Sequence, residues 1–303
     1  MTPTWVTLPE VLEITVFRGH EAAPDARPDL LIEVPHGATR TADFTALEAQ
    51  LTSPLPDRLV DFFHVNTDTG APELAAAVAE RFVAAHPTRT AAVLRCRIPR
   101  TFIDCNRRVD ASPEDFKAGK VTPGLMPWIT TAEDRALLRV RYDTYVATVQ
   151  TALEACLPEG AALLLHSYAP REVGVEVDAQ IVQSLHAAYA PEVVGTWPLR
   201  PEVDLIGRDL SGTSWLPEAV TERLRAGMAA VGVEVADGLT YPLHPSTLAH
   251  GHVVRWPGRV LCAEIRRDLL AEPFDPFAEM HIGAEKVRRL AAPLAAAVAA
   301  WWP

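Results

Sequence analysis

Three short, almost wholly apolar runs constrain the fold more than any other feature of the chain. They span residues 30–34, 161–165 and 260–265, and the first is closed by Pro35 and Gly37. A short apolar run of this kind is typical of a strand that is buried on both faces of a parallel sheet. The same patterns predict further strands at 11–17, 90–96 and 231–235, and helices at 71–85, 131–157, 216–230 and 277–302.

Because strands and helices alternate along the whole chain, we expect an α/β fold with a mostly parallel or mixed central sheet flanked by helices. We expect one domain over residues 1–303, since no low-complexity linker or internal repeat divides the sequence. Residues 109–129 lose this periodicity and collect proline and glycine. Loops of this length in a compact domain are usually functional or disordered, so we predict a lid or excursion there.

Composition excludes several classes of partner. The formal net charge is −11 and no stretch forms a basic stripe, so we expect neither nucleic acid nor an anionic membrane as a partner. No run reaches the roughly 20 apolar residues of a membrane span. The four cysteines show no C-x-x-C spacing, which is typical of free thiols in a reducing cytoplasm. The sequence therefore predicts a cytoplasmic protein and leaves the oligomeric state open.

Two histidines stand at strand ends, where open α/β sheets place their sites: His36 follows the run 30–34 and His166 follows the run 161–165. A catalytic zinc ion takes three protein ligands, among which neutral imidazole is common, and keeps one position open. A lone histidine is more often a hydrogen-bonded structural residue, but two in this setting favour a metal. Asp68, in a turn before the helix 71–85, is the best-placed third ligand. Glu33 and Glu73 remain rivals, although an extended strand turns Glu33 away from His36.

The stretch 100–108 reads Arg-Thr-Phe-Ile-Asp-Cys-Asn-Arg-Arg, and we expect it to continue the strand 90–96. An Asn106–Arg107 pair at a strand terminus suits an anionic ligand, because the guanidinium fork matches a carboxylate in a bidentate way. The alternative is an ion pair between arginine and aspartate that fixes a loop.

A metal site that hydrolyses needs a base, and Glu264 is the single acid inside the run 260–265. The alternative is an ion pair from Glu264 to Arg266 or Arg267. Ser167 is not a nucleophile candidate, since adjacent residues on a strand face apart and no G-x-S-x-G turn is present. Nor does the chain contain a P-loop or a G-x-G-x-x-G motif, so nucleotide chemistry has no support.

Taken together, these motifs resemble the N-formylglutamate amidohydrolase family in their residues and in their order. The resemblance covers roughly residues 30–270 and is carried by Val34-Pro-His-Gly37, Asp68-Thr-Gly70, Arg100 through Asp104-Cys-Asn-Arg107, Leu165-His-Ser167, Pro201-Glu-Val-Asp-Leu-Ile-Gly207 and Ala263-Glu-Ile265. It implies a fold and mechanism like those of zinc carboxypeptidases. Two departures concern the segment 243–252, which is rich in histidine where family members are rich in glycine, and Leu165, which stands where many members have aspartate.

The resemblance also implies a role for each candidate residue. The ligands of one zinc ion would be His36, Asp68 and His166. Glu264 would be the general base and acid, and Arg100 would steady the developing oxyanion. The substrate would be held by Asn106, Arg107, Ser167 and Arg171.

The implied function is a zinc-dependent hydrolase of linear amide bonds, which removes an N-acyl group, such as N-formyl, from a small carboxylate-bearing substrate. The two departures put the identity of the acyl group and of the side chain in question. One alternative is a carboxypeptidase-like hydrolase of short peptides. The other is a non-catalytic protein that binds acidic amino acids on the same fold.

Overall fold

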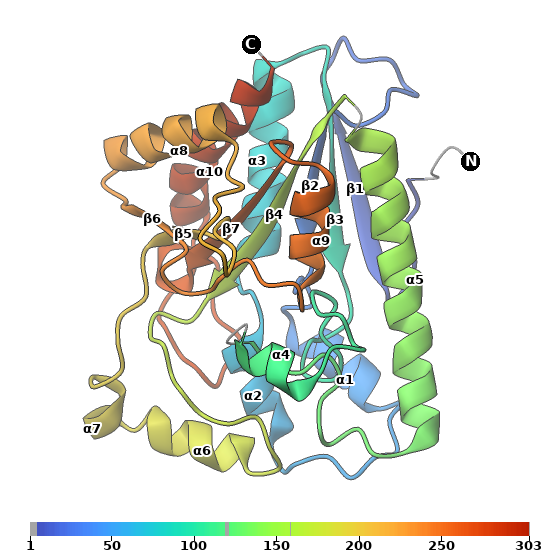
Figure 1. The fold of residues 1–303 in the computed structure, drawn as a ribbon, viewed down its shortest axis with the longest axis vertical. Coiled ribbons are helices and arrows are strands. Elements are labelled where there is room, and N and C mark those ends of the chain that lie inside the picture. Colours follow the sequence, from blue (N-terminus) through green and yellow to red (C-terminus); the bar gives the residue numbers. More distant parts are fainter. Residues whose placement is uncertain (1–4, 119–120, 158, 303) are drawn as a thin grey trace.

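The seven strands found in the described part of the chain form one mixed sheet (Figure 1). The computed structural model describes residues 5–118, 121–157 and 159–302. The strand order across the sheet is β1-β3-β2-β4-β7-β5-β6. The strands span Leu12–Arg18 (β1), Leu30–Val34 (β2), Thr90–Cys96 (β3), Ala161–Tyr168 (β4), Val203–Leu205 (β5), Val235–Asp237 (β6) and Val260–Arg266 (β7).

The four central strands, β3, β2, β4 and β7, run parallel to one another, while β1 and β5 pair antiparallel with the outer strands of this group. The predicted fold class, an α/β protein with a mixed sheet flanked by helices, is therefore confirmed. Because the central strands are parallel, their carboxyl ends meet at one edge of the sheet. The segments that follow β2, β3 and β4 all begin at this edge.

Helices cover both faces of the sheet (Figure 1). Alternate strand residues belong to two separate apolar clusters, one that includes α3, α8 and α10 and one that includes α1, α2, α5, α6 and α9. The helices span Thr41–Glu48 (α1), Leu59–Asn66 (α2), Ala71–Ala85 (α3), Pro113–Ala118 (α4), Ala132–Cys156 (α5), Ile181–Ala188 (α6), Pro191–Val194 (α7), Glu218–Ala230 (α8), Leu248–Arg255 (α9) and Ala284–Val298 (α10). In Figure 1, α1, α2, α4, α6 and α7 gather at the lower end of the molecule.

Several predicted elements occur where local signals were strong. Strands β2 and β3 and helix α3 have the predicted bounds. Helix α5 begins after Thr131, whose hydroxyl accepts a hydrogen bond from the backbone N–H of Asp134, as expected of an N-cap. These elements depend on the spacing of apolar residues along the chain and on capping residues, and both are local properties of the sequence.

Other predictions are wrong. The stretch 100–108 does not continue β3, which ends at Cys96; it forms turns with two isolated bridges. Helix α9 lies where no helix was predicted, and the last helix begins at Ala284 rather than at 277. The strand predicted at 231–235 begins at Val235, and helix α1 was not predicted at all. The predicted excursion 109–129 contains α4, while its residues 119–120 lie outside the described part of the chain.

Two expectations from composition can also be compared with the structure. No helix among the described residues combines the length and the apolar character that a membrane crossing needs. The four cysteines are buried and none forms a disulfide.

Candidate functional site

All nine residues predicted for the site line a single cavity of about 1040 Å³. The cavity lies at the carboxyl edge of the four central strands, since each of these strands leads into its wall. The nine residues are His36, Asp68, Arg100, Asn106, Arg107, His166, Ser167, Arg171 and Glu264. Strand order, rather than sequence separation, therefore places them together.

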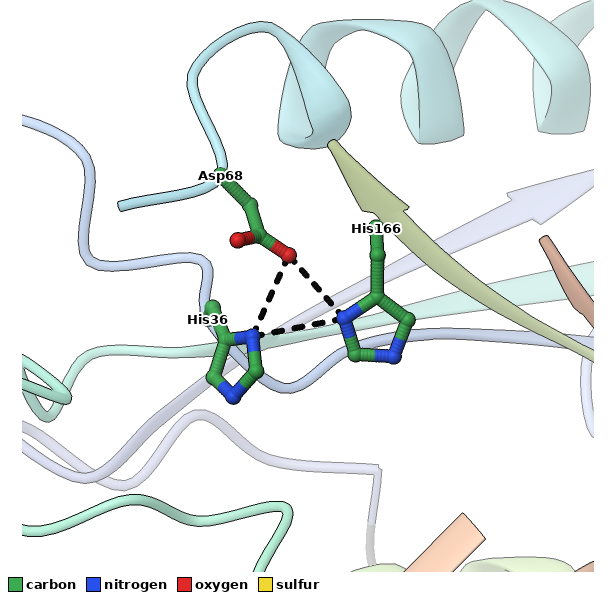
Figure 2. A group of neighbouring side chains, drawn as sticks. All are labelled: His36, Asp68 and His166. Atoms are coloured by element: carbon green, nitrogen blue, oxygen red, sulfur yellow. Dashed lines mark hydrogen bonds and ion pairs between the residues drawn. The ribbon is translucent and has the colours of Figure 1, made fainter. Parts of the chain in front are cut away.

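Three of these residues form a compact buried group, shown in Figure 2. The Nδ1 atoms of His36 and His166 lie 3.3 Å apart. Oδ2 of Asp68 lies 3.2 Å from Nδ1 of His36 and 3.0 Å from Nδ1 of His166. None of the three side chains is more than 3% exposed. The predicted third ligand, Asp68, is thus beside both histidines.

The two rival carboxylates lie elsewhere. Glu33 accepts a hydrogen bond of 2.7 Å from the hydroxyl of Tyr145 on α5. Glu73 forms an ion pair of 2.6 Å with Arg40. Neither belongs to the group of side chains that could hold a metal ion.

The two carboxylates that flank the ring of His36 show why a cation suits this group. Its Nε2 lies 2.8 Å from Oδ1 of Asp104, a carboxylate that is fully buried and can only accept. With the ring proton on Nε2, Nδ1 presents a lone pair toward Oδ2 of Asp68, so two acceptors face each other. A metal ion between them removes this conflict, and such carboxylate–histidine pairs commonly fix the tautomer of a metal ligand.

The distances also fit zinc. A tetrahedral ion with bonds of about 2.0–2.1 Å separates its ligand atoms by about 3.3 Å. The three ligand atoms here are 3.0–3.3 Å apart. The donor set therefore matches a zinc site with three protein ligands.

The turn that carries Asp68 is fixed from two sides. Gly70 has φ of 85°, and a Cβ there would lie 2.6 Å from Cβ of Leu270, so only glycine fits the close approach. Arg267 is 1% exposed and donates to the backbone carbonyls of residues 64, 65 and 67. On the other side, the hydroxyl of Ser167 donates to the carbonyl of Thr69 at 2.8 Å. Ser167 thereby joins the Asp68 turn to the strand that carries His166.

Asp104 connects the metal group to two arginines. Besides His36, its carboxylate contacts Nη2 of Arg100 at 2.8 Å and Nη2 of Arg107 at 3.6 Å. Burial opposes its ionisation, but Arg100 and then Arg107 hold the pKa of Asp104 well below its usual range. The sequence suggested an ion pair between arginine and aspartate as an alternative to ligand binding. The structure contains this ion pair, with both arginines lining the cavity and Asp104 buried behind them. Asp104 was not among the predicted site residues, although its spacing before Asn106 and Arg107 was a signal.

The segment 243–252 supports the predicted carboxylate clamp. Arg107 forms an isolated bridge with Thr247, and the backbone N–H of Leu248 donates to the carbonyl of Asn106. The backbone N–H of Ala249 donates to Oδ1 of Asn106, so the side-chain amide nitrogen remains as a donor. The Nε atom of Arg107 is buried and has no hydrogen-bond partner among the described residues. Both side chains keep donors available for an anion.

Glu264 is paired in register with His166 on the neighbouring parallel strand, so both side chains point to the same face of the sheet. Burial raises the pKa of Glu264 to about 7. Its Oε2 atom has no hydrogen-bond partner in the described part of the chain. Arg266 pairs with Asp268 instead, and Arg267 donates to the carbonyls already described. The carboxylate is therefore available for proton transfer.

The remaining predicted residue, Arg171, donates to the backbone carbonyls of Gly195 and Trp197 at the cavity wall. Sequence reasoning overlooked Arg200 and Tyr241, which line the same cavity and contact each other at 3.0 Å. Their positions in irregular segments gave no periodic signal.

Comparisons with known proteins bear on the family and on the fold. The sequence model of the N-formylglutamate amidohydrolase family matches residues 29–271. A crystal structure of N-formylglutamate amidohydrolase from Ralstonia eutropha is 18% identical, with a TM-score of 0.59, over 95% of this chain and 96% of that one. A gene product from Agrobacterium tumefaciens is 16% identical, with a TM-score of 0.53, over 98% of both chains. No curated protein matches the sequence.

Proposed function

The chain belongs to the N-formylglutamate amidohydrolase family, a family of amide-bond hydrolases, and we propose from this premise that it is a zinc-dependent amidohydrolase. Its substrate is a small molecule that bears a carboxylate, such as an N-acyl amino acid, and the scissile bond is the amide to the acyl group. Its place of action is the cytoplasm, a proposal supported by the four buried thiols.

The observation that carries this proposal is the buried group of His36, Asp68 and His166, together with Glu264, whose Oε2 atom has no hydrogen-bond partner among the described residues. Two imidazoles and one carboxylate that converge with about 3 Å between ligand atoms suit a catalytic zinc ion. A carboxylate with a pKa near 7 suits a base that must both take and return a proton at neutral pH.

Each residue of the chain has a role in the proposed reaction. The bound ion would polarise the scissile carbonyl and acidify a water molecule. Glu264 takes a proton from the attacking water and gives it to the departing nitrogen as the C–N bond breaks. Arg100, which is held by Asp104, stabilises the negative charge that develops on the carbonyl oxygen. Asn106 and Arg107 bind the substrate carboxylate.

The proposal is tested by Glu264→Gln in a zinc-loaded protein, with N-formyl, N-acetyl and longer N-acyl amino acids and with dipeptides as substrates. General acid–base catalysis typically contributes about 10²- to 10⁴-fold, so kcat for the preferred substrate is expected to fall by that factor. Bound zinc is expected to stay at one ion per chain, because glutamine fills the same space and Glu264 is not a ligand.

The matched control is Glu33→Gln, which changes a buried carboxylate on strand β2 of the same sheet that contacts Tyr145 instead of the cavity. This variant is expected to keep its turnover. Undiminished turnover of Glu264→Gln would remove Glu264 from the mechanism. A preference for dipeptides over all N-acyl amino acids would favour a peptidase, and absence of turnover with every substrate would contradict the enzyme proposal.

A further inference from the structure

The cavity is larger than the space that the proposed metal ligands, the carboxylate clamp and Glu264 require. Its volume of about 1040 Å³ is at the upper limit of the roughly 300–1,000 Å³ typical of sites for drug-sized ligands. The metal group, the carboxylate clamp and Glu264 occupy one part of its wall. An N-formyl amino acid with a short side chain would reach these groups and leave most of the remaining volume unfilled.

One wall of the remaining volume is an extended segment that follows β4. Val173, Val175 and Val177 are partly buried and pack against the apolar core, while Glu172 and Glu176 are exposed. This alternation is that of an extended chain with one apolar face, and all five residues lie at the cavity. The segment therefore turns its valines inward and its acidic side chains to water.

Apolar residues from other elements face the same volume. Phe62 on α2 and Ile181 and Leu185 on α6 are each at most 4% exposed and line the cavity. Val109 and Leu125, which are partly buried against the same core, contribute from the segment after the clamp. The apolar lining thus comes from four separate parts of the chain, so it is a built surface and not a single exposed side chain.

We propose that the substrate carries a large apolar group, of about six or more carbon atoms, which lies against the wall formed by Val173, Val175 and Val177. This inference rests on the proposed function and narrows its substrate class to amides that join a carboxylate-bearing unit to a bulky apolar unit. The apolar group is either the acyl chain or the side chain of the amino acid, since both adjoin the scissile bond. Burial of its surface supplies binding energy that a formyl group cannot.

The test measures affinity by calorimetry on zinc-loaded Glu264→Gln. N-formylalanine is compared with N-octanoylalanine, which lengthens the acyl group, and with N-formyl-2-aminodecanoate, which lengthens the side chain by the same number of carbons. Each fully buried methylene is worth about 4-fold in affinity, so burial of half of the added chain predicts a gain of about 100-fold. The compound that shows the gain identifies the side of the amide that meets the apolar wall.

A matched pair of variants locates the effect. Val175→Asn places a polar amide on the inward face and is expected to reduce the gain about tenfold, while Val140→Asn makes the same substitution at an exposed position of α5 outside the cavity lining and is expected to leave it unchanged. A gain below about 3-fold for both long compounds overturns the inference, as does an undiminished gain in Val175→Asn. Affinity is measured without turnover, so failure of the amidohydrolase proposal would appear separately, in the wild-type hydrolysis assay.

Discussion

Asp104→Asn is expected to weaken zinc binding although Asp104 is not a proposed ligand. The asparagine keeps the shape of the side chain but has one acceptor oxygen instead of two and no charge. In the wild-type protein, Nη2 of Arg100 donates to Oδ2 of Asp104 at 2.8 Å. If the oxygen of the asparagine in the variant keeps the contact to Nε2 of His36, the NH₂ group of the new side chain faces the N–H donors of Arg100. Loss of such a partner of a ligating histidine typically costs 10- to 100-fold in metal affinity, or about 1.4–2.8 kcal/mol.

The same substitution is expected to lower the stability of the metal-free protein. Asp104 is fully buried and serves two arginines, and removal of one partner from a buried ion pair typically costs about 3–5 kcal/mol. Zinc affinity is measured by competition with a chromogenic chelator, and the free energy of unfolding of the metal-free protein is measured by urea titration.

Asp43→Asn is the matched control. Asp43 is also a buried carboxylate between two arginines, Arg95 and Arg97, but unlike Asp104 it does not contact His36. This variant is expected to lose comparable stability and to keep its zinc affinity. Unchanged zinc affinity in Asp104→Asn, or an equal loss in Asp43→Asn, would refute the link between Asp104 and the metal group.

Three further predictions concern the ligands, the clamp and the base. Alanine at any of the three proposed ligands is expected to abolish stoichiometric zinc binding, whereas Glu33→Ala is expected to keep one zinc ion per chain by elemental analysis; the reverse would move the third ligand to Glu33. Arg107→Lys is expected to reduce kcat/KM nearly as much as Arg107→Ala, and the loss should disappear when the substrate carboxylate is converted to an amide; equal losses on both substrates would make Arg107 structural. In the metal-free protein the folded-state pKa of Glu264, about 7, lies above its ordinary 4.5, so its contribution to stability is complete below about pH 4.5 and is lost as pH rises through 7. As the pH rises from 4.5 to above 7, the wild type is therefore expected to lose about 3 kcal/mol of unfolding free energy relative to Glu264→Gln. A difference between the two proteins that does not change with pH would contradict the raised pKa.

The sequence determined the elements whose signals are local. The apolar runs of β2 and β3 and the proline-initiated helix α3 lie where the pattern predicts them, because burial, capping and chain period are properties of neighbouring residues. The polar residues at the ends of these runs were identifiable for the same reason. The positions of His36 and His166 after apolar runs, and of Asp68 before a helix, suggested a common metal site, and the family motifs implied the same three residues.

Only the tertiary structure decided how the ends of these elements meet. The order β3-β2-β4-β7 brings His36 and His166, which are 130 residues apart, to within 3.3 Å. The apolar residues of the stretch 100–108 are typical of a strand, yet the stretch forms turns. Asp104 stabilises these turns, because it forms an ion pair with Arg100 and accepts a hydrogen bond from the backbone N–H of Asn106. Such contacts depend on partners that are distant in the sequence or on buried charges, and neither produces a periodic pattern of apolar residues from which it could be predicted. The apolar wall of the cavity is of the same kind, since its residues become one surface only when four separate segments pack together.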